Sequence, residues 1–194
     1  VAILASVAFN SRVTLDNVYI EGITKITAKD IRYAKEMGCE IKLLGVARCQ
    51  EDGVEAYVCP MLIPAEHPLA SVNDSYNAVF VHGDAVGDTM FYGRGAGELP
   101  TASAVVGDVF EVVRNMKADC CGRVGCTCYK TLPVKAMADT HNRYFLRLQV
   151  EDRCGVLAEI LEHFAKYQAS VAQIMQKESK RPDTAEVVVI TKLV

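Results

Sequence analysis

An aperiodic stretch near the middle of this sequence, within residues 117–142, divides the chain into two patterned parts. The stretch contains four cysteines, two glycines and Pro133, a composition typical of a connection rather than of a helix or strand. With 194 residues, the chain is long enough for two domains that each bury a core. The pattern therefore predicts a domain at residues 1–116, a linker at 117–142 and a second domain at 143–194.

The first part alternates between predicted helices and pairs of strands. The apolar run at residues 1–11 predicts the end of a buried helix, and Thr27 and Asp30 have the spacing of a helix capping box. An Asp-Gly dipeptide at 52–53 is a strong hairpin signal, whereas Pro60 after the second strand predicts the end of regular structure. The predicted strands of this part are residues 40–49, 54–59, 77–82 and 89–92.

The second part has the order strand, helix, strand, strand. Apolar side chains alternate along residues 144–150, and a helix follows with Val156, Ile160 and Phe164 on one side. This order is the first two-thirds of a βαββαβ unit of the ferredoxin-like type. The predicted fold class is therefore α+β, with a mixed or antiparallel sheet covered by helices in the first domain and a partial ferredoxin-like module in the second. The two later strands are predicted at residues 171–177 and 185–193.

A glycine-rich segment before a long helix is the strongest candidate for a binding site. Gly93, Gly95 and Gly97 would let the backbone approach a ligand closely, and the free N–H groups of the helix would favour an anion or a carbonyl oxygen. The acidic residue and βαβ unit of a dinucleotide fingerprint do not surround this segment, and a tight turn with a helix cap explains it equally well. The apolar stripe of the helix, from Ala102 to Val113, is interpreted as core packing.

Composition excludes several classes of function. The formal net charge of −3, with no basic field in either part, argues against nucleic acid or an anionic membrane as a partner. No apolar run is long enough for a membrane span. Scattered cysteines without a disulfide spacing indicate a reduced, cytoplasmic protein. No metal site is predicted, although one set of cysteines leaves a metal- or redox-sensing role as an alternative: Cys120, Cys121, Cys126 and Cys128.

Short sequence blocks follow one another in a fixed order through the first domain. They include Val1–Phe9, His67–Ala70, Gly83–Gly87 and Gly93–Ser103. In this order the blocks resemble the C-terminal part of bacterial homoserine dehydrogenases. The segment from Asp152 to Leu157, at a strand-to-helix turn, resembles an ACT domain, the amino-acid-sensing module that many of these enzymes carry.

This resemblance implies part of an oxidoreductase that reduces L-aspartate 4-semialdehyde to L-homoserine with NAD(P)H, in the biosynthesis of threonine, methionine and isoleucine. It puts the catalytic lysine just before Val1, so we expect no catalytic residue in the chain. The chain is expected to lack the Rossmann domain, to bind no NAD(P) by itself and to be inactive alone. The sequence does not distinguish NADH from NADPH. The residues carried over as facing the cofactor are Gly93, Gly95, Gly97 and Thr101.

The ACT resemblance implies a regulatory site for an amino acid such as threonine. The residues carried over are Asp152, Gly155, Val156 and Leu157, with Asp152 either binding the ammonium group or capping the helix. Because the pattern stops before a last helix and strand, the module is expected to be partial. A homodimer is also expected, since strands of the first domain carry apolar residues on more than one face. The alternative function is a stand-alone ACT-type amino-acid-binding regulatory protein without enzymatic activity.

Overall fold

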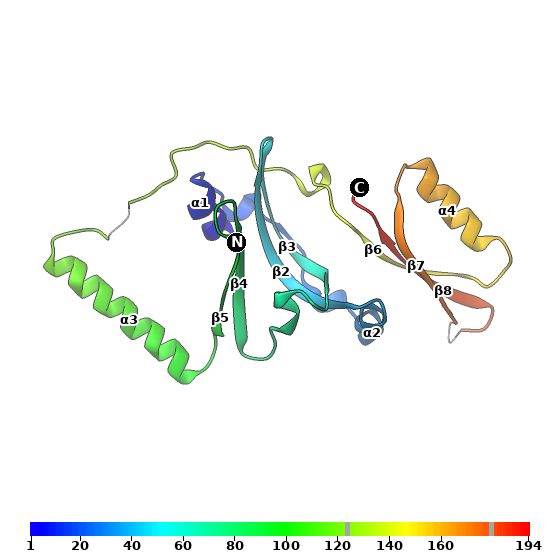
Figure 1. Ribbon diagram of the computed structural model, residues 1–194, viewed down its shortest axis with the longest axis horizontal. Coiled ribbons are helices and arrows are strands. Elements are labelled where there is room, and N and C mark those ends of the chain that lie inside the picture. Colours follow the sequence, from blue (N-terminus) through cyan, green and yellow to red (C-terminus); the bar gives the residue numbers. More distant parts are fainter. Residues whose placement is uncertain (123–124, 179–180) are drawn as a thin grey trace. The chain divides into compact units, whose positions relative to one another are not determined.

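The computed structural model describes residues 1–122, 125–178 and 181–194 and divides into two compact units, Val1–Val134 and Lys135–Val194 (Figure 1). The boundary falls inside the predicted linker because the chain just before it pairs with the first unit. The Lys130 N–H donates to the Asn10 carbonyl at 2.8 Å, and the Val54 N–H donates to the Pro133 carbonyl at 2.8 Å. The α+β class predicted from the sequence is confirmed.

The described elements keep the predicted order of helices and strands. The first unit contains α1 (Ala2–Phe9), β1 (Tyr19–Ile20), α2 (Ala28–Glu36), β2 (Cys39–Gln50), β3 (Gly53–Pro64), β4 (Tyr76–Gly83), β5 (Gly87–Arg94) and α3 (Glu98–Lys117), with short 3-10 turns at Leu15–Asn17, Ile23–Lys25 and Pro68–Ser71. The second unit contains a 3-10 turn at Met137–Asp139, then β6 (Phe145–Glu151), α4 (Val156–Lys166), β7 (Val171–Glu178) and β8 (Thr184–Thr191). No helix in these described ranges is both long and apolar enough to cross a membrane.

The hairpin of β2 and β3 is the main structural feature of the first unit. The two strands pair antiparallel along their whole length, from Cys39 opposite Pro64 to Gln50 opposite Gly53, so the hairpin expected at the Asp-Gly dipeptide is confirmed. The predicted break at Pro60 is wrong, because β3 continues through it. Beyond Val58, β3 pairs with β2 alone among the described strands, and proline is tolerated at such an edge.

The two short α-helices of the first unit, α1 and α2, agree with the sequence predictions to different degrees. In α2, the Thr27 hydroxyl accepts from the Asp30 N–H at 3.3 Å, and the Asp30 carboxylate accepts from the Thr27 N–H at 2.8 Å, which confirms the capping box. The expectation that residues 1–11 are a buried helix is half right. Helix α1 forms, but Ala5 is its only buried residue, and Ile3 remains 80% exposed. Ala5 packs in a small core with Val13, Val54 and Ala56.

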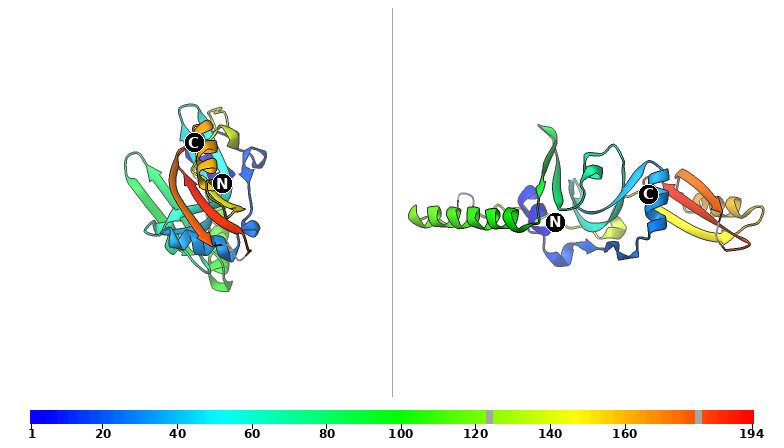
Figure 2. Two further views of the ribbon diagram at one scale, coloured as in Figure 1. Left: turned by 90° about the vertical axis from the view of Figure 1, so that its right-hand side faces the viewer. Right: turned by 90° about the horizontal axis from the view of Figure 1, so that it is seen from below.

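Strands β4 and β5 form a separate two-stranded ribbon that leads into α3 (Figure 2). The interpretation of the α3 stripe as core packing is wrong, because no residue of α3 is buried. Val109 is 56% exposed and Phe110 59% exposed. The helical period identifies an apolar face correctly, but it does not specify what lies opposite that face, and none of the described residues buries it.

The second unit is a three-stranded antiparallel sheet in the order β6-β8-β7. Helix α4 lies along one face of this sheet (Figure 1). The central strand β8 is buried on both faces, since Val187, Val188 and Val189 are each 1% exposed or less. The one acidic side chain of β8, Glu186, is 3% exposed and pairs with Arg147 at 3.6 Å. The predicted strand, helix, strand, strand order is confirmed.

Candidate functional site

The structure brings the four residues predicted to face the cofactor together at the junction of β5 and α3. Gly93 lies in β5 opposite Asn77, and the Gly95 N–H donates to the Ser75 carbonyl at 3.2 Å. Gly97 is the residue before the first turn of α3, and its carbonyl accepts from the Thr101 N–H at 3.1 Å. The junction is therefore a backbone structure fixed to the start of β4.

The three glycines of this junction differ in the space around them and in their backbone conformation. A Cβ at Gly95 would collide with the side chain of Asn77, so glycine allows that side chain to keep its present position. Gly97 has φ +127°, a conformation that other residues rarely adopt. A Cβ at Gly93 would meet nothing within 4 Å. The fold therefore accounts for glycine at two positions and leaves the surface over Gly93 open.

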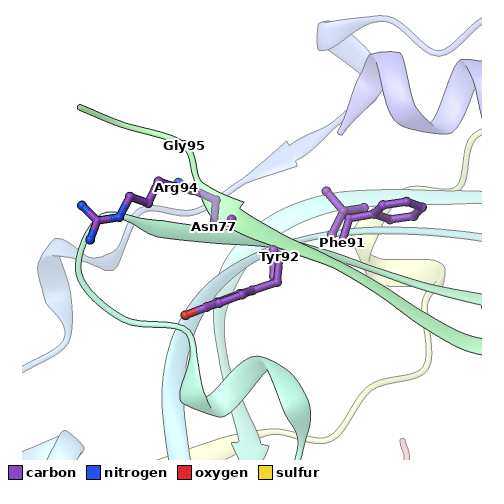
Figure 3. A pocket seen from close by; sticks show the side chains of 8 residues that line it. Asn77, Phe91, Tyr92, Arg94 and Gly95 are labelled. Carbon is purple, nitrogen blue, oxygen red and sulfur yellow. The ribbon is translucent and has the colours of Figure 1, made fainter. Parts of the chain in front are cut away.

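A shallow depression of about 290 Å³ lies over this open surface (Figure 3). Phe91 and Tyr92 point to opposite sides of the ribbon, as neighbours in a strand must. Asn77 Nδ2 donates to the Ser75 carbonyl at 3.4 Å, which leaves the Asn77 amide oxygen available at the rim. The depression is lined by Asn77, Ala78, Val79, Phe91, Tyr92, Gly93, Arg94 and Gly95.

An aromatic and cationic stack on the same ribbon was not predicted from the sequence. The rings of Tyr76 and Tyr92 stack with centroids 4.9 Å apart and planes 3° apart, and the Arg94 guanidinium lies 5.3 Å from the Tyr76 centroid. Tyr92 and Arg94 are two residues apart in β5, so they share a face, and Arg94 pairs with Tyr76 in register. This alternation was visible in the sequence, but the register that completes the stack was not.

The negative charge of Glu98 at the start of α3 affects which kind of ligand group the junction can bind. Glu98 lies in the first turn and places a negative charge where the helix dipole would otherwise attract an anion. A phosphate is therefore disfavoured there, whereas a neutral carboxamide remains compatible with open backbone and the Asn77 amide. The junction is therefore better suited to an uncharged group than to a phosphate.

The strand-to-helix turn of the second unit is a second candidate site. Gly155, with φ +92°, is the residue that precedes α4, and no side chain caps this helix. The suggested capping role of Asp152 is therefore wrong. Its N–H donates to the Asp183 carbonyl at 3.0 Å, which ties the end of β6 to the turn before β8.

A charged cluster beside this turn was also not predicted from the sequence. The Arg153 guanidinium donates to both carboxylate oxygens of Glu159, at 2.9 Å each, and its Nε donates to Glu151 at 3.2 Å. These hydrogen bonds and the Arg153 charge lower the pKa of Glu159. The paired carboxylate oxygens show that Arg153 is engaged within the cluster rather than directed at solvent alone.

A depression of about 400 Å³ adjoins the cluster. Of the four residues predicted to bind an effector, Val156 lines it, whereas Asp152, Gly155 and Leu157 do not. No sequence pattern predicted the cluster, because the contact between Arg153 and Glu159 depends on the conformation of the turn between β6 and α4. The depression is lined by Val150, Glu151, Arg153, Val156, Glu159, Ile160 and His163.

The fold defines an α+β chain with an open glycine junction, and comparisons with known proteins identify its family. The homoserine dehydrogenase family model matches residues 1–110. The chain is 47% identical to homoserine dehydrogenase of Corynebacterium glutamicum, over 98% of this chain and 43% of the relative. It is 40% identical to the enzyme of Bacillus subtilis, over 98% of this chain and 44% of the relative. The chain belongs to the homoserine dehydrogenase family.

Solved structures agree with these sequence matches over both units. A homoserine dehydrogenase from Thiobacillus denitrificans superposes with a TM-score of 0.89 at 39% identity, covering 100% of this chain and 44% of that one. A homoserine dehydrogenase from S. aureus superposes with a TM-score of 0.66 at 30% identity, covering 98% of this chain and 45% of that one. The chain thus spans less than half the length of the relatives that it matches.

Proposed function

We propose that this chain is part of a homoserine dehydrogenase, the enzyme that reduces L-aspartate 4-semialdehyde to L-homoserine with NAD(P)H. The observation that carries the proposal is the match of the whole chain to members of this family, together with the open glycine junction of β5 and α3. The described sheets are antiparallel apart from the two-residue pairing of β1 with β3, so they contain no doubly wound dinucleotide-binding sheet. We therefore propose that these sheets contribute only part of the cofactor site of the parent enzyme.

The role proposed for the glycine junction is to form one wall of the cofactor site. The bound cofactor supplies the hydride, and the protein's contribution is to hold the nicotinamide ring near the aldehyde. Open backbone at Gly93 and the fixed positions of Gly95, Gly97 and Thr101 suit close approach of a flat, uncharged ring. Asn77 lies beside this backbone with an amide that complements a carboxamide. No catalytic residue is assigned within the chain.

The proposal extends to assembly and location. We infer a homodimer built on the first unit, because large apolar side chains there remain exposed. Val81 is 43% exposed, Phe91 69% and Val113 55%. Patches of this kind on a protein surface mark association sites. We also propose a cytoplasmic location, since the cysteines are free thiols. We further propose that residues 1–116 form the substrate domain, with 117–142 as the linker to the second unit.

We propose that the second unit is a partial ACT-type module in which Asp152, Gly155, Val156 and Leu157 contribute to an amino-acid site. The sheet order β6-β8-β7, with α4 on one face, supports a ferredoxin-like arrangement. Threonine is the proposed effector. Because the elements β6, α4, β7 and β8 make up only part of a βαββαβ unit, we expect threonine to bind the chain weakly or not at all when it is studied alone.

A chimera tests the proposed enzyme function. In it, this chain replaces the matching segment of the Corynebacterium glutamicum homoserine dehydrogenase. The purified chimera is expected to oxidise NADPH or NADH when L-aspartate 4-semialdehyde is added, and to restore growth of a strain that requires homoserine. The isolated chain is expected to give no turnover, because proton and hydride transfer need groups held at reaction distance.

Two controls separate failure of the proposal from failure of the protein. Circular dichroism and light scattering establish that the chimera is folded and that its mass is that of the intact relative's assembly. A folded chimera without turnover contradicts the assignment to homoserine dehydrogenase. Tight threonine binding by the isolated chain, measured by calorimetry, would instead favour the alternative of a stand-alone amino-acid-binding protein.

A further inference from the structure

The two cysteines of the Cys-x-Cys segment, Cys126 and Cys128, have no place in the proposed enzyme function. Both lie in the stretch that follows α3 within the first unit. Cys126 is exposed and Cys128 is half-buried, and both are free thiols. Peroxides and small disulfides in solution can therefore reach the exposed Cys126 more easily than the half-buried Cys128.

The two thiols are linked by hydrogen bonds. The Cys126 sulfur accepts a hydrogen bond from the backbone N–H of Cys128 and a second from the Cys128 thiol. These bonds, the backbone one first, together with the Arg12 charge lower the pKa of Cys126. Its thiolate, the form that reacts with oxidants, is therefore more populated at neutral pH than in an ordinary cysteine.

The backbone around Cys128 is held in place by hydrogen bonds. The Tyr129 N–H donates to the Thr127 carbonyl at 2.8 Å, which forms a tight turn with Cys128 at its centre. The next residue, Lys130, donates to the Asn10 carbonyl at 2.8 Å, and Leu132 donates to Oγ of Ser11 at 3.0 Å. Ser11 is only 1% exposed. These bonds thus fix the backbone at Cys128 and anchor this segment beside the end of α1.

We propose that Cys126 and Cys128 form a peroxide-sensitive dithiol that closes to a disulfide, with Cys126 as the attacking sulfur and Cys128 as the resolving one. The Cys126 thiolate attacks one oxygen of hydrogen peroxide, the O–O bond breaks, and Cys126 becomes a sulfenic acid while hydroxide leaves and takes up a proton. The Cys128 sulfur then attacks the Cys126 sulfur, the S–O bond breaks and water leaves as the Cys128 proton is lost. In total, two thiols lose two electrons to one peroxide, which yields one disulfide and two waters.

Mass spectrometry of the full chain tests this assignment. Trypsin cleaves after Arg123 and Lys130, so the peptide Val124–Lys130 contains Cys126 and Cys128 and no other cysteine. After brief treatment with hydrogen peroxide, this peptide is expected to be lighter by two hydrogen atoms and to resist iodoacetamide. The peptide Cys154–Lys166 contains one exposed cysteine and serves as the internal standard. Cys126 is expected to react with iodoacetamide at least about three-fold faster than Cys154 at neutral pH.

Single substitutions distinguish the roles of the two sulfurs. The Cys128→Ser variant is expected to retain a sulfenic acid at Cys126 that dimedone labels, whereas Cys126→Ser is expected to leave Cys128 largely unoxidised. The double variant Cys120→Ser/Cys121→Ser is the matched control and is expected to behave as the unaltered chain. Oxidation of Cys126 at the rate of Cys154, or a disulfide confined to the peptide with Cys120 and Cys121, would overturn the proposal.

Discussion

Helices α3 and α4 carry the same kind of apolar stripe but meet different environments. Helix α4 lies along one face of the sheet of the second unit (Figure 1), and its Val156, Ile160 and Phe164 are half-buried. In α3, Val109, Phe110 and Val113 are all more than half exposed. The comparison shows that helical periodicity predicts which face will be apolar, while burial depends on a neighbouring sheet that the helix pattern does not encode.

The strands of the two regions differ in the same way. Strand β8 is the centre of a three-stranded sheet and buries Val187, Val188 and Val189 completely or nearly so. The ribbon of β4 and β5 has no third strand among the described residues, and Val79 on it is 41% exposed. Isolated two-stranded ribbons are marginally stable in water. The region of β4, β5 and α3, here named the exposed arm, is therefore the part of the first unit that is most dependent on outside contacts.

The largest expected effect comes from placing a charge in each region. Val188→Asp buries an unpaired carboxylate at a site with no exposure, so we expect a loss of about 4 kcal/mol or more and unfolding of the second unit. Val109→Asp on the exposed arm is expected to change the free energy of unfolding of the monomer by less than about 0.5 kcal/mol. Chemical denaturation followed by circular dichroism measures both. Equal effects would show that α3 is packed in the monomer.

A second, smaller effect is expected within the exposed arm. Gly95→Ala forces Asn77 to move and breaks its hydrogen bond to the Ser75 carbonyl, which we expect to cost about 1 kcal/mol of local stability. Hydrogen exchange of the β4 and β5 amides measures this loss, with β2 and β3 as internal reference. In an Asn77→Ala background, where most of the clashing side chain and its hydrogen bond are already absent, Gly95→Ala should cost clearly less. An equal cost of Gly95→Ala in both backgrounds would contradict the contact between Asn77 and Gly95.

The smallest effect concerns acid stability of the second unit. The folded pKa of Glu159 is lowered from its ordinary 4.5 by hydrogen bonds from Arg153 and by the Arg153 charge, so its stabilising contribution is present above the unfolded value and is lost as pH falls through the folded one. Glu159→Gln should therefore be slightly less stable than the unaltered chain at pH 7, and the difference should shrink below about pH 4.5. Acid titration of thermal unfolding measures it. A difference that grows as the pH falls would contradict the pairing.

Local signals in the sequence predicted more of the fold than of the sites. The capping box of α2, the hairpin of β2 and β3, and the strand, helix, strand, strand order all rest on neighbours in the chain, and all are confirmed. The stack of Tyr76, Tyr92 and Arg94 depends on strand register, and the cluster of Arg153 with Glu159 depends on the angle of a turn. The continuation of β3 through Pro60 depends on the fact that β3 pairs with β2 on one edge there and with no described strand on the other. Such features follow from three-dimensional pairing and have no short-range signature.

We propose that the exposed arm presents the glycine junction to the cofactor of a homoserine dehydrogenase. Gly93 offers the most direct measurement, because a Cβ there meets nothing within 4 Å and substitution should leave the fold intact. In the chimera described above, Gly93→Val is expected to lower kcat/KM for the nicotinamide cofactor at least about ten-fold, equivalent to about 1.4 kcal/mol. The exposed Cys154→Ser variant in the second unit, used as the control, is expected to leave it unchanged. A folded Gly93→Val chimera with unaltered kcat/KM would contradict the claim.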